Sequence, residues 1–244
     1  MSRVGPGPTP SLAAQRAALV AAMAVTTAAA WMYLITSGER MIGGSRHEVL
    51  IALPVWAAMM IGMMLPGATP MFAAYVGVNE RNGSRWQPLA AFVLAYGFLW
   101  IGVSALGACI QQALAGAGLL SHMGVSTRPV LSGSLLVLAG VYQFSPLKQA
   151  CLRRCRTPLG FLLTEWRPGT SGALKLGWRH GVECLLCCWA LMALMFVLGT
   201  MNLLWMAALT ALMLVEKSAP AGQIIGRWCG ALFVAWGVAL AIAR

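Results

Sequence analysis

The chain contains 244 residues, of which 59% are hydrophobic and 9% are charged. Soluble domains carry roughly a quarter charged residues, so this composition excludes an ordinary soluble fold and favours a membrane protein. Seventeen Lys or Arg residues stand against six acidic residues, and the formal net charge is +11. All six acidic residues are Glu, which excludes a site built on paired aspartates.

The N-terminal tail is rich in proline. Pro6, Pro8 and Pro10 disfavour both helix and central strand, and they predict a disordered tail over residues 1–14. A single integral membrane domain is expected over residues 1–244, because six or seven spans of ~20 residues with their loops use nearly all of that length.

Seven apolar stretches predict an all-α fold, a polytopic bundle of about seven transmembrane helices. The fifth and sixth stretches are short and are joined by Gly199–Asn202, so a re-entrant hairpin, which leaves six spans, is the alternative. The stretches cover residues 17–35, 49–78, 89–114, 129–144, 183–198, 203–215 and 228–242.

The second stretch contains an irregular segment. Leu65–Pro70 includes two prolines and interrupts an apolar run that would reach ~45 Å as one straight helix, which exceeds a hydrocarbon core of ~30 Å. The sequence therefore predicts a broken helix at this segment. Such a break either ends a helix at the membrane surface or lines a site.

The basic residues are distributed unequally between the two sides of this topology. Thirteen of the 17 Lys and Arg residues fall on the N-terminal side. The positive-inside rule then predicts a cytoplasmic N-terminus and a basic cytoplasmic loop over residues 145–182. Because the basic residues follow membrane sidedness, the expected partner is the lipid bilayer and no nucleic acid partner is expected.

Three cysteines lie close together at the start of the fifth apolar stretch. Cys184, Cys187 and Cys188 are spaced i, i+3 and i+4, so their thiols share one face of a helix. Helical steps add His180, Met192 and Met195 to that face. Soft sulfur ligands favour copper as Cu(I), with zinc as the alternative. Packing in a helix bundle is the competing interpretation, above all for the two methionines.

A second cysteine pair occupies the predicted cytoplasmic loop. Cys151 and Cys155 are spaced i, i+4, and three neighbouring arginines can offset thiolate charge or simply determine topology. Together with Cys184 and Cys187, the pair gives CxxxC followed by CxxC. This pattern is compatible with a four-sulfur metal site if the intervening residues fold back.

Methionines and glutamates add secondary candidates to the site. Glu183 precedes the first cysteine of the trio and is interpreted as a ligand or as a helix-start residue, whereas Glu216 and Lys217 are interpreted as an interfacial anchor. The methionines before the irregular segment form either a thioether-lined path or ordinary core packing. They are Met59, Met60, Met63 and Met64.

Several of these segments resemble a bacterial family of uncharacterised integral membrane proteins with predicted metal binding. The resemblance implies metal binding and a multi-pass location in the bacterial inner membrane, and it implies no particular reaction. It covers about two thirds of the chain and rests on Tyr142–Lys148, Cys151–Arg156, Cys187–Met192, Gly199–Leu203 and Glu216–Lys217, with a weaker match from Met59 to Pro66.

Three functions are consistent with these patterns. The leading hypothesis is metal transfer, transport or homeostasis through cytoplasmic-side cysteines, with a metallochaperone or a membrane protein as partner. A membrane thiol-disulfide oxidoreductase is the second, because Cys184 and Cys187 form a CxxC pair. The third is a structural or assembly subunit whose loop is held by zinc. No Walker loop, GxSxG or HExxH motif is present, so the sequence assigns no enzymatic reaction.

Overall fold

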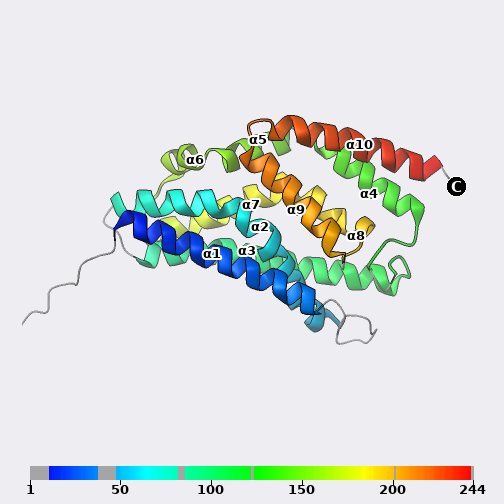
Figure 1. Ribbon diagram of the computed structural model, residues 1–244, viewed down its shortest axis with the longest axis horizontal. Coiled ribbons are helices and arrows are strands. Elements are labelled where there is room, and N and C mark those ends of the chain that lie inside the picture. Colours follow the sequence, from blue (N-terminus) through cyan, green and yellow to red (C-terminus); the bar gives the residue numbers. More distant parts are fainter. Residues whose placement is uncertain (1–10, 38–47, 82–85, 122–123, 201, 243–244) are drawn as a thin grey trace, which may run out of the picture.

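Helices form the regular secondary structure of the described chain. The computed structural model describes residues 11–37, 48–81, 86–121, 124–200 and 202–242. Within these ranges the strand-like pairing is limited to an isolated bridge between Leu120 and Ser126, so the predicted all-α class is confirmed. The helices are α1 (Leu12–Ser37), α2 (Glu48–Arg81), α3 (Trp86–Gly116), α4 (Pro129–Tyr142), α5 (Pro146–Arg156), α6 (Pro158–Glu165), α7 (Gly169–Ala193), α8 (Met195–Leu198), α9 (Leu203–Ser218) and α10 (Gly222–Ile242), as labelled in Figure 1.

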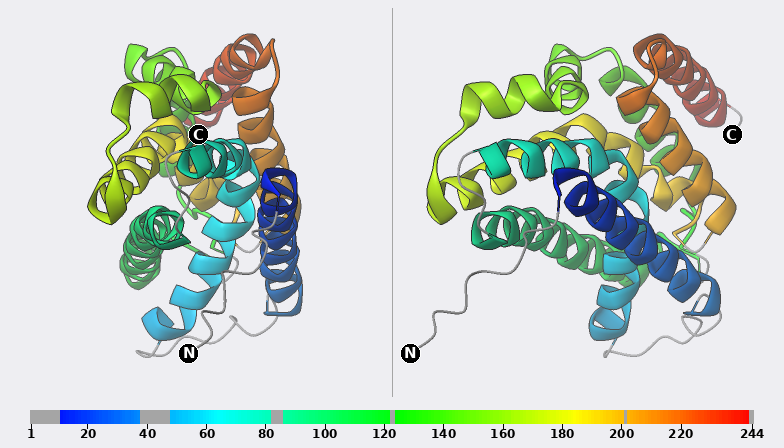
Figure 2. Two further views of the ribbon diagram at one scale, coloured as in Figure 1. Left: turned by 90° about the vertical axis from the view of Figure 1, so that its left-hand side faces the viewer. Right: turned by 60° about the vertical axis from the view of Figure 1, so that its left-hand side comes forward.

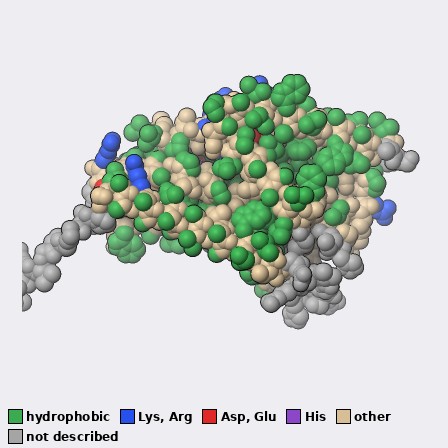
Figure 3. Space-filling view, in the orientation of Figure 1, with side chains coloured by type: hydrophobic (Ala, Val, Ile, Leu, Met, Phe, Trp, Pro, Cys, Tyr) green, Lys and Arg blue, Asp and Glu red, His purple; other side chains and the backbone are tan. Residues whose placement is uncertain are grey.

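Long apolar helices dominate the bundle. In the described ranges, five helices are long and apolar enough to cross a membrane, and six if the bent pair α4 and α5 counts as one span. These helices are compatible with membrane insertion. The six-span alternative fits this range better than seven spans, because α9 has only 16 residues. Figure 3 shows apolar side chains over most of one face, with basic side chains toward its periphery.

Helix α2 corrects the prediction of a broken helix. It is helical from Glu48 to Arg81, with Pro54, Pro66 and Pro70 inside it. Each proline removes one backbone donor and crowds the preceding turn, which bends a helix without necessarily ending it. Figure 2 shows that α2 changes direction along its length. The proline-rich segment therefore redirects the helix through the bundle.

The predicted loop and tail also differ from the structure. Residues 145–182 contain α5, α6 and the first half of α7, so this segment is largely helical. Hydropathy missed the first half of α7 because Lys175 and Arg179 reduce the apolar signal there without stopping a helix. Of the predicted tail, residues 1–10 lie outside the described ranges, and α1 already begins at Leu12.

The helices pack in adjacent pairs. Helix α1 lies along α2, α3 along α7, and α4 along α10. The α4–α10 pair is closest at glycines, where a Cβ added to Gly133 would lie 2.8 Å from the carbonyl oxygen of Gly237. Small residues at such a contact let two backbones approach each other. The polar interior is surrounded by α2, α5, α7 and α9.

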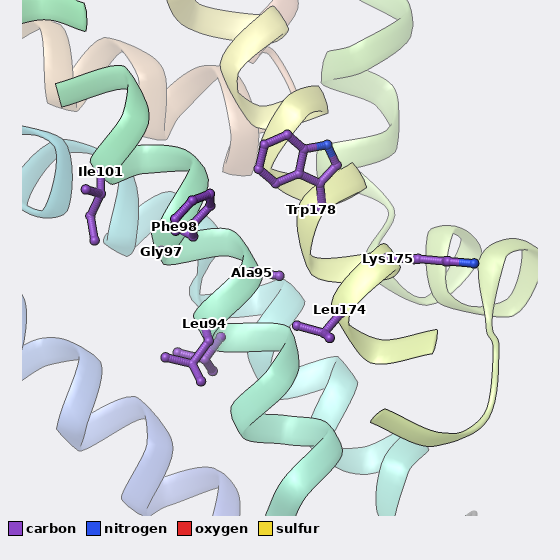
Figure 4. Close-up of a pocket in the computed structure, with 9 residues that line it drawn as sticks. Leu94, Ala95, Gly97, Phe98, Ile101, Leu174, Lys175 and Trp178 are labelled. Atoms are coloured by element: carbon purple, nitrogen blue, oxygen red, sulfur yellow. The ribbon is translucent and has the colours of Figure 1, made fainter. Parts of the chain in front are cut away.

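An apolar groove lies between α3 and α7. It is lined mainly by hydrophobic residues such as Leu94, Phe98, Leu174 and Trp178, and Figure 4 shows their arrangement. Its lining contains no Cys, His or Met residue. The groove between α3 and α7 therefore offers no soft metal ligand.

Candidate metal centre

Helix α5 begins at a well-defined turn after α4. Ser145 is the N-cap of α5, and its hydroxyl accepts a hydrogen bond from the backbone N–H of Lys148 at 3.1 Å. Pro146 follows at the first helical position, where no backbone donor is needed. The two helices meet at 62°. This sharp turn directs α5 across the bundle, toward α7 and α9.

Basic side chains then hold α5 in place. Arg154 donates a hydrogen bond to Glu183 of α7 at 2.6 Å, and Arg156 donates to the backbone carbonyls of Glu216 and Ala219 at 2.9 and 2.7 Å. The second contact satisfies carbonyls at the end of α9 that have no partner within the helix. Arg154 and Arg156, which could have determined membrane topology alone, thus connect α5 with α7 and α9.

The cysteine trio lies in the buried part of α7. Cys184, Cys187 and Cys188 are each only 1% exposed. The thiols of Cys187 and Cys188 both donate to the backbone carbonyl of Cys184, at 3.0 and 2.9 Å. The spacing of i, i+3 and i+4 places all three side chains on the interior face of α7.

The second cysteine pair faces this trio. Cys155 is buried and lies close enough to Cys184 and Cys187 to interact with both. Cys184 has Cys155, Cys187 and Cys188 as neighbours. Cys151, one turn earlier in α5, is also buried and lies near Cys187 and Glu183. The segments around Cys155 and Cys184 therefore meet, and we call Cys155, Cys184, Cys187 and Cys188 the thiol cluster.

A thioether and a phenol also border the thiol cluster. Cys188 Sγ lies 3.6 Å from Met64 Sδ of α2, and Cys184 Sγ lies 3.6 Å from the hydroxyl of Tyr96 of α3. Both neighbouring side chains are buried. Helix α2 thus adds a second type of soft sulfur donor, a thioether, to the same place.

A buried ammonium group lies against the most central thiol. Lys217 Nζ of α9 donates to Cys184 Sγ at 3.2 Å. Gly67 of α2 makes room for it, since a Cβ at that position would lie 3.0 Å from Lys217 Cδ and 3.4 Å from Nζ. Lys217 was predicted as an interfacial anchor, and this interpretation is wrong because its side chain points into the protein.

The neighbouring Glu216 is likewise buried. Its carboxylate oxygen Oε2 lies 2.7 Å from Lys148 Nζ of α5, and the two side chains are only 3% and 2% exposed. By hydropathy, charged residues near a helix end are expected at the membrane interface. The sequence therefore predicted that Glu216 and Lys217 anchor the helix end there. The two opposite charges lie against each other, so this part of the interior holds a buried ion pair.

His180 lies one helical turn before Cys184. It is 2% exposed, and neither of its ring nitrogens has a hydrogen-bond partner among the described residues. Its ring stacks on Tyr96, with centroids 5.5 Å apart, and contacts Phe161. Buried polar atoms without partners are uncommon in native proteins, and a free imidazole nitrogen beside thiols is chemically a metal donor.

The present side-chain arrangement is not a closed cage. Among the described residues, no group of three His, Cys, Asp or Glu side chains is arranged to hold one metal ion. Two thiols of the cluster point to the Cys184 carbonyl instead. Rotation of Cys187 and Cys188 between staggered side-chain conformers would free both sulfurs for a cation. The cluster therefore brings the thiol side chains together without orienting them toward one common point.

The remaining predicted residues are placed as follows. Glu183 lies in the middle of α7, not at its start, and its Oε1 lies 2.6 Å from Arg154 and 3.6 Å from Arg179. Its partners are arginines, which suits a role in holding α5. The secondary methionines are all buried in the interior of α2, α7 or α8: Met59, Met60, Met63, Met64, Met192 and Met195.

Three residues of the centre were not predicted. Lys217, Lys148 and Tyr96 lie on three different helices, and their contacts with the site depend on how those helices pack. Two of them do lie inside the segments that resemble the metal-binding family, Tyr142–Lys148 and Glu216–Lys217. The resemblance to the metal-binding family would have grouped Lys148 and Lys217 with the cysteines, whereas hydropathy did not.

Comparison with known proteins identifies a family. A protein-family model described as "PpoB2: Copper chaperone" matches residues 53–240, which include every residue of the thiol cluster. No match was found among curated proteins or among solved structures. The family match confirms the metal-related part of the resemblance seen in the sequence and supports copper as the metal.

Proposed function

The chain belongs to the PpoB2 family of copper chaperones, and from this membership we propose that it binds copper as Cu(I) at the thiol cluster and passes the ion on. The observation that carries the proposal is the approach of Cys155 of α5 to Cys184 and Cys187 of α7. Thiols from two segments of the chain meet there in a buried interior, and the thioether of Met64 lies beside them.

The donor set favours Cu(I) over zinc. Thiolates and thioethers together are soft ligands, and they suit Cu(I) better than harder cations. Structural zinc sites are four-coordinate and closed, with thiolate or imidazole ligands. The thioether beside Cys188 and the incompletely oriented thiols fit a cation that is held and released. Copper is accordingly a cargo in this proposal.

The surrounding charges support a multi-thiolate site. Deprotonated thiols bring negative charge into a region shielded from water, which is costly unless positive groups are close. Lys217 lies 3.2 Å from Cys184, and Arg154 lies on the turn between Cys151 and Cys155. In this proposal Lys217 offsets the charge of the copper-thiolate complex. Glu183 holds α5 against α7, so that Cys155 stays within reach.

The position of the cluster suggests the direction of access. The excess of Lys and Arg on the N-terminal side favours a cytoplasmic location for the start of α7, where thiols stay reduced, and the cysteines lie about midway along the apolar span Gly169–Leu198. A soluble copper donor or an acceptor on that side is the partner this topology implies. We propose a multi-pass location in the inner membrane on the same grounds.

X-ray absorption spectroscopy of the Cu(I)-loaded protein tests the proposal. We expect a copper coordination shell dominated by sulfur, and an identical spectrum from Cys109→Ser, whose exposed cysteine lies far along α3 from the cluster. A shell of oxygen or nitrogen ligands would refute the thiol cluster as the copper site. Preferential retention of zinc would favour a structural staple, and a reversibly oxidised Cys184–Cys187 pair without copper would favour an oxidoreductase.

Replacing the buried lysine tests the charge argument. Lys217→Met is expected to weaken Cu(I) binding about 10- to 100-fold, because a charge-assisted hydrogen bond in the interior is lost. Competition with a Cu(I) chelator measures the change. Lys175→Met is the matched control, since Lys175 is an exposed lysine of α7, and we expect no change in affinity. Tighter binding by Lys217→Met would instead mean that the ammonium competes with the cation.

A further inference from the structure

A row of buried methionines continues from the thiol cluster into the bundle. Cys188 Sγ lies 3.6 Å from Met64 Sδ, so the row begins in direct sulfur contact with the cluster. Its members come from α2, α7, α8 and α9, and each is at most 6% exposed. We call these residues the methionine column: Met60, Met64, Met192, Met195, Met206 and Met213.

Two contacts relate α2 to the segment formed by α7 and α8. Met64 of α2 meets Cys188 of α7, and eight residues away along each segment Trp56 of α2 meets Phe196 of α8, with ring centroids 5.7 Å apart. The two segments are therefore antiparallel and in step. Met60 and Met192 lie halfway between these contacts on their respective helices, so they lie at the same level. A pair of thioethers, Met60 and Met192, thus follows the thiol–thioether pair Cys188 and Met64, one helical turn deeper.

Helix α9 is in register with the same row. Lys217 contacts Cys184, and α9 returns along α7 after the turn at Gly199, which has a φ of 99°. Met213 lies one turn before Lys217 and therefore at the level of Cys188. Met206 lies 11 residues before Lys217, and Met195 lies 11 residues after Cys184. At a rise of ~1.5 Å per residue, both methionines lie equally far along the helix axes from the Lys217–Cys184 contact. They therefore lie at the same depth in the bundle.

We propose that the methionine column is a second Cu(I) site, weaker than the thiol cluster and continuous with it. This inference rests on the proposed function. Thioethers are neutral donors that bind Cu(I) without losing a proton and without offsetting its charge. The affinity is consequently lower than that of the thiolates. Copper keeps its oxidation state throughout, so the site needs no oxidant or reductant.

The column is also well separated from outside ligands. Trp56 and Phe196 pack together at its far end, and Trp56 Nε1 donates a hydrogen bond to Gln111 at 2.7 Å, which fixes the indole. A weak site in line with a strong one lets a cation leave a thiolate cage stepwise.

Four proteins titrated with Cu(I) in the presence of a competing chelator test the column. The first is the wild type, and the second is Met60→Leu with Met192→Leu, which keeps side-chain volume and is tolerated in most cores. The third replaces Cys155, Cys184, Cys187 and Cys188 with Ser. The fourth combines both sets. Met23→Leu, a buried methionine of α1, is the control for volume and packing.

The titrations separate the two proposals. We expect the wild type and Met23→Leu to bind one tight and one weaker Cu(I), the leucine variant to keep only the tight ion, and the serine variant to keep only the weaker one. The combined variant should bind neither. A leucine variant that retains the weaker ion, or a wild type that binds a single ion, overturns the column. A serine variant that retains the tight ion overturns the thiol cluster instead.

Discussion

Cys184→Ser is expected to weaken Cu(I) binding by at least about 100-fold, which exceeds the usual effect of removing an outer-shell partner. Cys184 interacts with the thiols of Cys155, Cys187 and Cys188, and it is also the acceptor for the Lys217 ammonium. A serine hydroxyl at this position is a hard donor of similar shape, so the fold should survive while the soft ligand is lost.

Chelator competition in detergent measures this loss, and the helical circular dichroism signal confirms that the variant is folded. Cys109→Ser provides the matched substitution at an exposed cysteine and should bind copper as the wild type does. If Cys184→Ser binds copper with unchanged affinity, Cys184 is not a ligand, and the centre must be built on the other thiols alone.

Lys148→Met is expected to destabilise the protein by about 3 to 5 kcal/mol, because it leaves the carboxylate of Glu216 buried without its partner. The pair is 2.7 Å apart, and its side chains are 2% and 3% exposed. Replacing both residues with Met should restore most of the stability, since the uncompensated charge is then gone. Thermal unfolding in detergent gives the comparison.

The exposed ion pair between Arg179 and Glu165 provides a control for the buried pair. Glu165→Gln removes a carboxylate whose partner is 47% exposed, and its effect should stay within about 1 kcal/mol. A double variant as unstable as Lys148→Met alone would show that packing, and not the unpaired charge, dominates at this position. An unchanged Lys148→Met variant would contradict the argument directly.

The helical class and most helix positions followed from the sequence, because apolar runs separated by short polar turns leave few alternatives. The starts and bends of the helices were harder to predict. Helix α7 begins at Gly169, well before the predicted stretch, since Lys175 and Arg179 reduce hydropathy without interrupting a helix. The prolines of α2 indicated a break, yet neighbouring helices support a bent helix there.

The spacing of the cysteines placed the trio on one face of α7, since that arrangement depends only on helical periodicity. The contribution of Cys155 required α5 to turn at Ser145 and to dock through its arginines, which spacing alone does not specify. Lys217 is a second residue whose position could not be predicted from the sequence. A lysine at a helix end is usually solvated, and only the space above Gly67 allows this one to point inward.

The order in which the chain is made adds a consequence of the Lys217–Cys184 contact. Cys155 and the trio are synthesised well before residue 217, and the helix that carries Lys217 reaches them only after the turn at Gly199 has formed. Chains emerge from the ribosome N-terminus first, so the half-made protein holds its thiols without their neutralising ammonium. If copper binds at the thiol cluster as proposed, we expect loading to follow completion of the polypeptide, and a nascent chain to compete poorly for cellular copper.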